Sequence, residues 1–484
     1  MAAAFSAILG KEIIVPPYNG VIGAIGAALL AREKMSALEL ETTFRGYDLD
    51  KIDYKIREFT CKGCTNYCDI QEFTVEGNKT YWGDKCSDRY RKRAKVPKKA
   101  IIPDLMTMYD ELLERDAIPL VEEKLNVKID TTPPSSGAKR IGFPRAMYFY
   151  ERFQFWNTYL RALGQEVVLT PPTNKKISHL GVETAVSEPC FPIEVAHGHV
   201  MALLEEDVDM ILVPNVIDAE TDTAGVNSYM CPWGQTLPFV LRSLPIFEGR
   251  EDFIAAPTVH FREGYKFVER ELWGFAKGLG VKRSRHKLAV KAGFYAQDMF
   301  TRELEDIGRD VLRKLDETGE VGIILVGRPY NVMDREVNLD VPGKLRDYYG
   351  VNVIPIFFLP IEGIGIRDIN DNMFWNFGRK ILQAARLAAQ KDNLHLIYIT
   401  NFKCGPDSYV KHYATRAAEK PFLTLQFDGH GNDAGIMTRC EAYLDSKGVL
   451  RWWLRKEKPS KEEPSISREC LTEEQEPLQR LSGI

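Results

Sequence analysis

Blocks of apolar residues alternate with amphipathic blocks along the middle of the chain. From Arg140 the apolar segment RIGFPRA is followed by the amphipathic segment FYERFQFWNTYLRALG and then by the apolar segment EVVLTPP. Two apolar strands on either side of an amphipathic helix predict a βαβ unit. The segments FPIEVAHGHVMALLEE and MILVPNV repeat this order, and a helix over 234–244 is predicted to end this half of the body.

A long helical region over 294–315 leads into a second series of strands and helices. Its strands are VGIILVGRP, VNVIPIFF, LHLIYIT and PFLTLQFD, and helices are predicted after Val341, over 374–390, after Ser408 and after Ala434. Nearly every residue of these strands is apolar, which is typical of parallel strands that are covered on both faces. The pattern therefore predicts two doubly wound α/β domains.

The first 35 residues follow a different pattern. They predict a strand over 12–15, a turn at two consecutive prolines, and a helix that contains three glycines. One strand and one helix cannot bury a core, so we expect this piece to dock on the rest of the chain or on a partner. The charged residues 448–484 are expected to be disordered.

The length of 484 residues allows two to four domains. We predict these divisions: a strand and helix over 1–35, a Cys-rich metal module over 36–100, a helical linker over 101–138, a first α/β domain over 139–285, a second over 286–447, and a charged tail over 448–484.

Composition excludes several classes of protein. A hydrophobic fraction of 44% with 27% charged residues is an ordinary globular balance. The net charge of −4 gives no general attraction to nucleic acid or to anionic lipid. The longest apolar run, over 20–31, is shorter than the roughly 20 residues that cross a bilayer, and no basic residue precedes the first apolar stretch, as a secretory signal would require. We expect a cytoplasmic protein.

Three of the nine cysteines occupy similar positions in the predicted body. Cys190 in SEPCFP, Cys231 in YMCPWG and Cys404 in KCGPDS each come directly before a predicted helix. In a parallel sheet such turns lie at the edge where ligands bind, and the positive end of a helix stabilises a thiolate or an anionic iron–sulfur cluster. The alternative is that each cysteine is a small buried residue.

Four further cysteines lie near the N-terminus, in the order Cys61-x-x-Cys64-x-x-x-Cys68 and, after seventeen residues, Cys86. The short spacing lets two sulfurs reach one ion, and the hairpin-like segment DIQEFTVEGNKTYWGDKC returns a fourth ligand. Four thiolates suit zinc or an iron–sulfur cluster. A second cluster here would give electrons a path to the main site, and the sequence does not decide between the two metals.

No catalytic residue is identified by the sequence alone, although three candidates lie near predicted strand ends. Glu188 stands close to Cys190. Arg328 follows a strand and could contact an anionic ligand such as a CoA phosphate, or hold a turn. His430, in DGHGNDAG, could transfer protons, or its turn could simply cap the next helix.

Several segments between 139 and 447 resemble the 2-hydroxyacyl-CoA dehydratase component family, in the branch called acyl-CoA dehydratase activase-related proteins. The segments are IGFPRAMYFYERFQFW, SEPCFPIEVAHGHV, ILVPN, YMCPWGQ, LVGRPYN with NLDVPGKL, TNFKCGPDSY and DGHGNDAGIMTRCEAYLDS. In that family two or three flavodoxin-like lobes hold a 4Fe-4S cluster through three cysteines, and one iron stays open. The matching positions here are Cys190, Cys231 and Cys404. Some relatives carry a double-cubane cluster, which would recruit Cys440; the alternative for Cys440 is a buried structural role.

The segment VPPYNGVIGAIGAALLA resembles the closing strand and helix of the activase ATPase, a member of the sugar-kinase, Hsp70 and actin superfamily. The phosphate-binding hairpins and metal-binding acidic residues of that ATPase are absent, and no G-x-x-x-x-G-K-[ST] motif is found. We expect no ATP hydrolysis by this chain alone. The chain resembles the C-terminal part of a longer fusion, or a split version of it.

The resemblance implies an iron–sulfur redox component of anaerobic metabolism. It would accept electrons from an activase-type ATPase and reduce an acyl-CoA or another small molecule, as part of a lyase or an oxidoreductase. The alternative is a non-catalytic electron-transfer or scaffold subunit with a structural zinc module. Neither hypothesis includes nucleic acid or a membrane as a partner, and the substrate and the oligomeric state stay open.

Overall fold

The computed structural model describes residues 2–39, 41–42, 44, 46–47, 52–61, 69–83, 98–221, 223–429 and 433–450. Contacts divide the chain into two units, of which the first holds residues 1–52 together with 451–484, and the second holds residues 53–450. The predicted tail lies almost entirely outside the described residues. No described helix is long and apolar enough to cross a bilayer.

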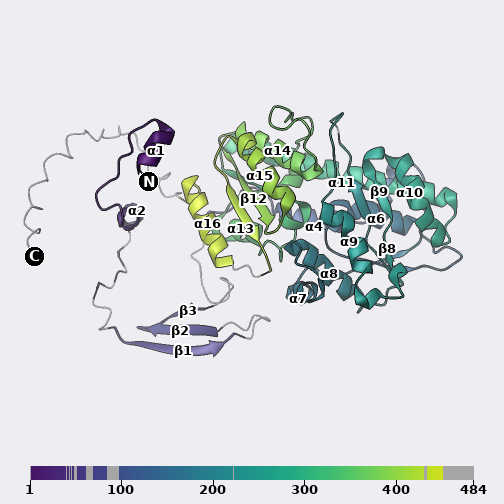
Figure 1. Cartoon of the computed structure of the whole chain (residues 1–484), viewed down its shortest axis with the longest axis horizontal. Helices are drawn as coiled ribbons and strands as arrows, with labels where there is room; N and C mark the ends of the chain where they lie inside the picture. The colour runs from purple at the N-terminus through teal and green to yellow at the C-terminus, as the bar shows by residue number, and fades with distance from the viewer. Residues whose placement is uncertain are drawn as a thin grey trace, which may run out of the picture. The chain divides into compact units, whose positions relative to one another are not determined.

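The described part of the first unit consists of two helices, α1 (Ala2–Leu9) and α2 (Ile22–Ala37) (Figure 1). Neither helix buries any side chain. The predicted strand over 12–15 is wrong, because these residues have no regular structure and pair with no described strand. An isolated strand leaves its backbone groups without neighbours to bond. The helix α1 was not expected, although its alanine-rich sequence favours a helix.

The second unit begins with an antiparallel sheet of three strands, β1 (Tyr54–Thr60), β2 (Asp69–Val75) and β3 (Asn78–Trp82), in the order β1-β2-β3 (Figure 1). The predicted hairpin is confirmed as β2 and β3. Its two turn residues, Glu76 and Gly77, both have positive φ, at 48° and 81°. Such a turn matches the right-handed twist of the strands that it joins.

The predicted helical linker forms two helices, α4 (Leu105–Glu114) and α5 (Ile118–Leu125). The carboxylate of Asp104 caps α4, since it accepts hydrogen bonds from the backbone amides of Met106 and Thr107.

The first parallel sheet follows, in the order β5-β4-β6-β8. Its strands are β4 (Arg140–Phe143), β5 (Glu166–Leu169), β6 (Met210–Leu212) and β8 (Ile254–Ala255). Its helices are α6 (Phe149–Ala162), α7 (Lys175–Thr184), α8 (Phe191–Leu203), α9 (Pro232–Arg242) and α10 (Tyr265–Gly278). The predicted βαβ unit is confirmed as β4, α6 and β5. A separate parallel pair, β7 (Asn215–Asp218) and β9 (Thr258–His260), is too short to show in the sequence pattern.

The second parallel sheet has the order β11-β10-β12-β13. Its strands are β10 (Gly322–Gly327), β11 (Asn352–Pro355), β12 (Leu394–Asn401) and β13 (Leu423–Phe427), and all four were predicted. Its helices are α12 (Pro329–Val332), α13 (Val341–Tyr349), α14 (Asn376–Ala389), α15 (Gly405–Ala418) and α16 (Asp433–Ser446). Every residue of β10 is buried, as expected for a central parallel strand.

Both sheets place their first strand second in the order. In each sheet, the second strand along the chain pairs on one side of the first strand, and the later strands lie on its other side. At such a switch point, ligands bind outside the carboxyl ends of the strands. The α/β class is confirmed, whereas the grouping into two flavodoxin-like domains stays a prediction, since one unit contains both sheets.

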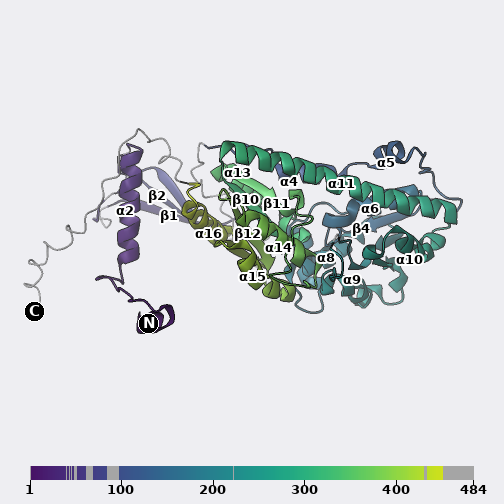
Figure 2. The ribbon, with the colours of Figure 1, turned by 90° about the horizontal axis from the view of Figure 1, so that it is seen from above.

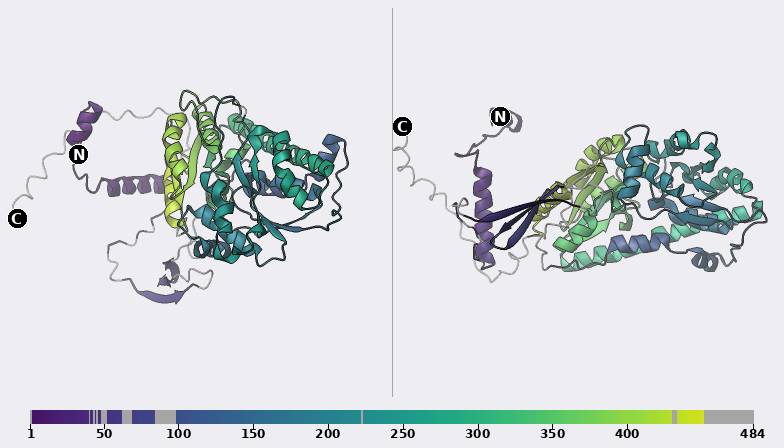
Figure 3. Two further views of the ribbon diagram at one scale, coloured as in Figure 1. Left: turned by 45° about the vertical axis from the view of Figure 1, so that its right-hand side comes forward. Right: turned by 90° about the horizontal axis from the view of Figure 1, so that it is seen from below.

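The helix α11 (Arg283–Thr318) joins the two halves of the body, which lie next to each other (Figures 2 and 3). Two of its glycines permit close approach. A Cβ on Gly293 would lie 2.8 Å from the ring of Phe155 on α6, and a Cβ on Gly308 would lie 1.4 Å from the carbonyl oxygen of Phe358 in the second half. The predicted boundary between residues 285 and 286 falls in the first turn of this helix and stays a prediction.

Candidate functional site

Three cysteines stand at the N-caps of three helices, as their sequence positions indicate. Cys190 precedes α8, Cys231 precedes α9, and Cys404 precedes α15. Each helix has a proline in its first two positions, which presets the backbone and leaves no N–H there to satisfy. All three side chains are buried, with exposures of 5%, 7% and 9%. The positive ends of three helices therefore carry buried thiols.

The three thiols lie close enough for their charges to interact. Burial raises the pKa of the Cys190 thiol, and the charges of Cys231 and Cys404 raise it further. Burial and the charge of Asp407 raise the pKa of Cys404 to about 12. The ion pair of Glu188 with Lys403 at 2.9 Å brings the turns of Cys190 and Cys404, which belong to different halves of the body, near each other.

The described residues contain no group of three His, Cys, Asp or Glu side chains arranged around a single metal ion. Four irons and four sulfides occupy more space than one ion and hold their thiolate ligands further apart, so this finding does not test a cluster.

Arg328 is the cation beside the three thiols. It caps α12 at the end of β10 and is buried, so it is not placed to meet a ligand at the molecular surface. Its Nε donates a hydrogen bond to Oδ1 of Asp407 at 3.0 Å. Burial opposes its charge, but Asp407 and, more weakly, Tyr330, Cys404 and Cys231 keep the pKa of Arg328 above its usual value.

One nitrogen of Arg328, Nη2, is buried and has no hydrogen-bond partner among the described residues. An unsatisfied donor of a buried cation is costly, and an anionic group at the thiol site would satisfy it. A small cavity of about 10 Å³, lined by residues that include Cys231, Arg328, Tyr148 and Tyr330, lies beside this arginine. Three buried thiols beside the guanidinium of Arg328, which has an unsatisfied donor, are therefore a suitable environment for an anionic cluster with thiolate ligands.

Glu188 lies at the rim of the site. Its side chain is 88% exposed and pairs with Lys403 at 2.9 Å. The two residues stand next to the Cys190 and Cys404 turns, so the pair connects the two halves of the body across the rim. An exposed pair of this kind adds little stability, and a catalytic role of Glu188 stays a prediction.

The remaining candidates of the body are placed differently. His430 lies outside the described residues. Cys440 is fully buried in the middle of α16. It lies seven residues after the first residue of the helix, which is about 10 Å along the axis. The structure therefore brings Cys190, Cys231 and Cys404 to helix N-termini and does not bring Cys440 to one.

Only Cys61 of the four N-terminal cysteines is described, and it is buried directly after β1. Cys64, Cys68 and Cys86 lie outside the described residues. The described flanks meet at one edge of the sheet, because Thr60 pairs with Asp69 and a Cβ on Gly83 would lie 2.1 Å from the carbonyl oxygen of Asp69. The four-cysteine metal site stays a prediction.

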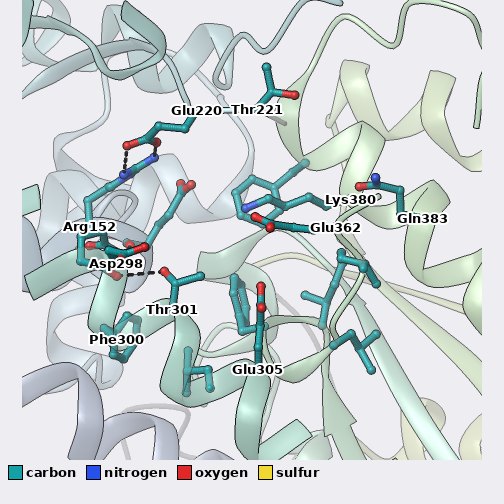
Figure 4. Close-up of a pocket in the computed structure, with 18 of the residues that line it drawn as sticks. Arg152, Glu220, Thr221, Asp298, Phe300, Thr301, Glu305, Glu362, Lys380 and Gln383 are labelled. Carbon is teal, nitrogen blue, oxygen red and sulfur yellow. Dashed lines mark hydrogen bonds and ion pairs between the residues drawn. The ribbon is translucent and has the colours of Figure 1, made fainter. Parts of the chain in front are cut away.

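The sequence did not predict a cleft of about 500 Å³ in the second unit (Figure 4). It is lined by residues of α4, α6, α11 and α14, and it shares Glu151 and Phe377 with the small cavity at Cys231. Its charged lining residues include Lys380 on α14 and Glu151 on α6. The available signal was a charge inside a largely apolar helix, as in FYERFQFW.

Residues 140–358 match the model of a family described as a CoA enzyme activase uncharacterised domain. The match runs from β4 to the short helix η5 (Ile356–Phe358) and includes Cys190, Cys231 and Arg328, but not Cys404. It supports the relation to activase-related proteins that the sequence segments indicate. No curated protein matches the chain.

Proposed function

We propose that this chain is an iron–sulfur redox component that accepts electrons from an ATP-driven activase and passes them to a small molecule, an acyl-CoA or another compound. The observation that carries the proposal is that three buried thiols stand at helix N-caps and that the buried Arg328 pairs with Asp407, in the first turn of the helix that Cys404 caps. The match to a CoA enzyme activase domain and the shared strand order of the two sheets, which is that of flavodoxin-like folds, support it.

Cys190, Cys231 and Cys404 would hold a 4Fe-4S cluster, which supplies low-potential one-electron chemistry when it is bound. The N-termini of α8, α9 and α15 stabilise negative charge on the three sulfurs. Arg328 adds a full positive charge, and Asp407 fixes the direction of its guanidinium. Thr400 holds Asp407 in turn, since its hydroxyl donates to Oδ2 at 2.6 Å. Asp407 and Thr400 would thus hold Arg328 in a fixed orientation, in which it offsets the negative charge of the cluster, as residues behind the direct ligands do in metal centres.

Cys61, Cys64, Cys68 and Cys86 would hold a second cluster or a zinc ion. Cys440, fully buried within α16, is assigned a packing role, and recruitment to a larger double-cubane cluster is the alternative. The protein would act in the cytoplasm, with an activase-type ATPase as its partner.

The alternative function is a non-catalytic electron-transfer or scaffold subunit with a structural zinc module. The cleft shares Glu151 and Phe377 with the small cavity at Cys231, which favours the redox component with a substrate, because a scaffold needs no binding cleft near its thiols.

The test is electron paramagnetic resonance of anaerobically purified full-length chain, mixed with a cognate activase and a strong reductant. We expect a reduced-cluster signal that grows when ATP is added, and no ATP hydrolysis when the activase is left out. Reducing an anionic, partly buried cluster is electrostatically costly, so transfer should depend on nucleotide. Spectra that are identical with and without ATP would contradict the proposal.

A further inference from the structure

The cleft of about 500 Å³ has aromatic walls and charged residues around one space (Figure 4). Its volume is in the range of small-molecule sites. The aromatic lining residues, which come from the linker and from both halves of the body, are Tyr109, Phe294, Phe300, Phe357 and Phe377. Such walls suit a ligand with an apolar body.

Lys380 is the cation of the cleft that forms no direct ion pair with a described residue. In the described part of the chain, no carboxylate lies within 4 Å of its Nζ and no hydrogen bond to it is formed, while the ring of Phe377 lies 5.1 Å from Nζ. Burial lowers the pKa of Lys380, against the opposing charge of Glu151. The ammonium of Lys380 therefore has carboxylates nearby, but none among the described residues within ion-pair distance.

The other two cations of the cleft are already held. Arg152 donates two hydrogen bonds to the carboxylate of Glu220, one of them at 3.0 Å. Arg379 donates to the carbonyl oxygen of Asn227 at 3.0 Å and to Oδ1 of Asn376 at 2.8 Å. Lys380 is therefore the basic group that is available to a ligand.

Carboxylates on the same space also form few direct ion pairs with described residues. Burial raises the pKa of Glu151, and among the described residues its side chain has no ion pair or hydrogen bond. Burial and the charge of Glu362 raise the pKa of Glu305. Among the described residues, Glu305 pairs with Arg309 at 3.7 Å and is also within the influence of the Lys380 charge, and Glu362 has no ion pair. Figure 4 shows Glu305, Glu362 and Lys380 around one space.

We propose that this cleft binds a small zwitterion with an apolar body, of the class of aromatic or large aliphatic amino acids. The ligand's carboxylate would meet Lys380, its ammonium would lie among Glu151, Glu305 and Glu362, and its side chain would contact the aromatic walls. Five carboxylates against three basic groups line the cleft, so a polyanion such as the phosphates of CoA is repelled from it.

The binding site lies beside the thiol site, because the cleft and the small cavity at Cys231 share Glu151 and Phe377. The inference thus narrows the substrate class within the proposed function. Binding itself depends only on the side chains of the cleft, and it is expected with or without a cluster.

Three probes of one shape test the inference by ligand-observed NMR titration of the full-length chain: phenylalanine, 3-phenylpropanoate and 2-phenylethylamine. We expect phenylalanine to bind about tenfold tighter than either single-charge probe, since each charge-assisted contact contributes about 1.5–3 kcal/mol. Equal binding of the three probes would overturn the proposal, and so would tightest binding of either singly charged one.

Variants assign the two ends of the ligand. Lys380→Met should weaken phenylalanine and 3-phenylpropanoate about tenfold and leave 2-phenylethylamine unchanged, whereas Lys380→Arg should retain all three. Glu362→Gln should weaken only the probes that carry an ammonium. Lys287→Met, an exposed change on α11, is the matched control and should alter nothing. If Lys380→Met left the affinity for both carboxylates intact, the site would be wrongly placed.

The titration is repeated on iron-free protein and on the Cys404→Ser variant. Unchanged binding there is the expected result. If phenylalanine fails to bind while iron is retained by the native chain, only the ligand class is refuted; loss of iron with intact binding would refute the cluster instead.

Discussion

Arg328 and Asp407 form an ion pair whose side chains are only 3% and 2% exposed. Removing one partner leaves a buried charge uncompensated, which costs about 3–5 kcal/mol. We expect Arg328→Leu to lower the free energy of unfolding by this amount, measured by denaturant titration of the iron-free chain.

The double variant Arg328→Leu with Asp407→Leu distinguishes the contribution of Arg328 to stability from its contribution to iron retention. Because both charges are gone, most of the stability should return, yet iron retention should stay low because no cation faces the thiols. Recovery of full iron content in the double variant would show that Arg328 serves packing alone.

The buried side chain of His199 makes the folding stability depend on pH. It is buried on α8, and its Nδ1 and Nε2 lie 2.6 Å and 2.9 Å from the hydroxyls of Thr170 and Thr173. Burial, with a smaller effect of Arg145, lowers the pKa of His199 to about 3. An unfolded chain protonates this histidine near its usual value of about 6.5.

Between these two values the unfolded state binds one more proton, so stability falls as the pH falls from 6.5 toward 3, by up to about 1.4 kcal/mol per pH unit. His199→Gln should reduce the stability loss between pH 6.5 and 5.5 by about 1 kcal/mol relative to the native chain. His412→Gln, a change at an exposed position of α15, should leave the pH-dependence as it is. Parallel curves for the native chain and His199→Gln would argue against a neutral buried histidine.

At the scale of elements, the close packing of helix α11 against the second half of the body requires a glycine at position 308. Gly308→Ala places a Cβ against the backbone of Phe358, which cannot move as a flexible side chain can. We expect a loss of about 1–3 kcal/mol in unfolding free energy, as for other overpacked sites. Gly274→Ala in α10 meets no atom within 4 Å and should instead add up to about 1 kcal/mol. Equal effects of the two changes would contradict this packing.

Elements with strong local signals were predictable. The strands β10 to β13 are nearly continuous apolar runs, and the three cysteines of the body stand next to prolines that begin helices. The strand over 12–15 was wrongly predicted from its apolar residues, because a strand also needs a neighbour, which the local sequence cannot supply.

At the scale of the whole molecule, the sequence located the thiols but not their surroundings. Arg328 and Asp407 are 79 residues apart in the chain, and no local pattern indicates their contact. Nor does a local pattern indicate that Lys380 and Glu151 line one cleft, since each lies on an amphipathic helix where a charge is usually solvated. The cleft exists only because α11 holds the two halves of the body together.

The central claim is that Cys190, Cys231 and Cys404 together hold a cluster. The most direct measurement is the iron and sulfide content of four anaerobically purified serine variants, together with their absorbance near roughly 400 nm, where thiolate-to-iron charge transfer is seen. Cys190→Ser, Cys231→Ser and Cys404→Ser should each lose most of the cluster that the native chain binds, while Cys440→Ser, equally buried but on α16, should keep it. Full iron in the Cys404→Ser protein would contradict the account.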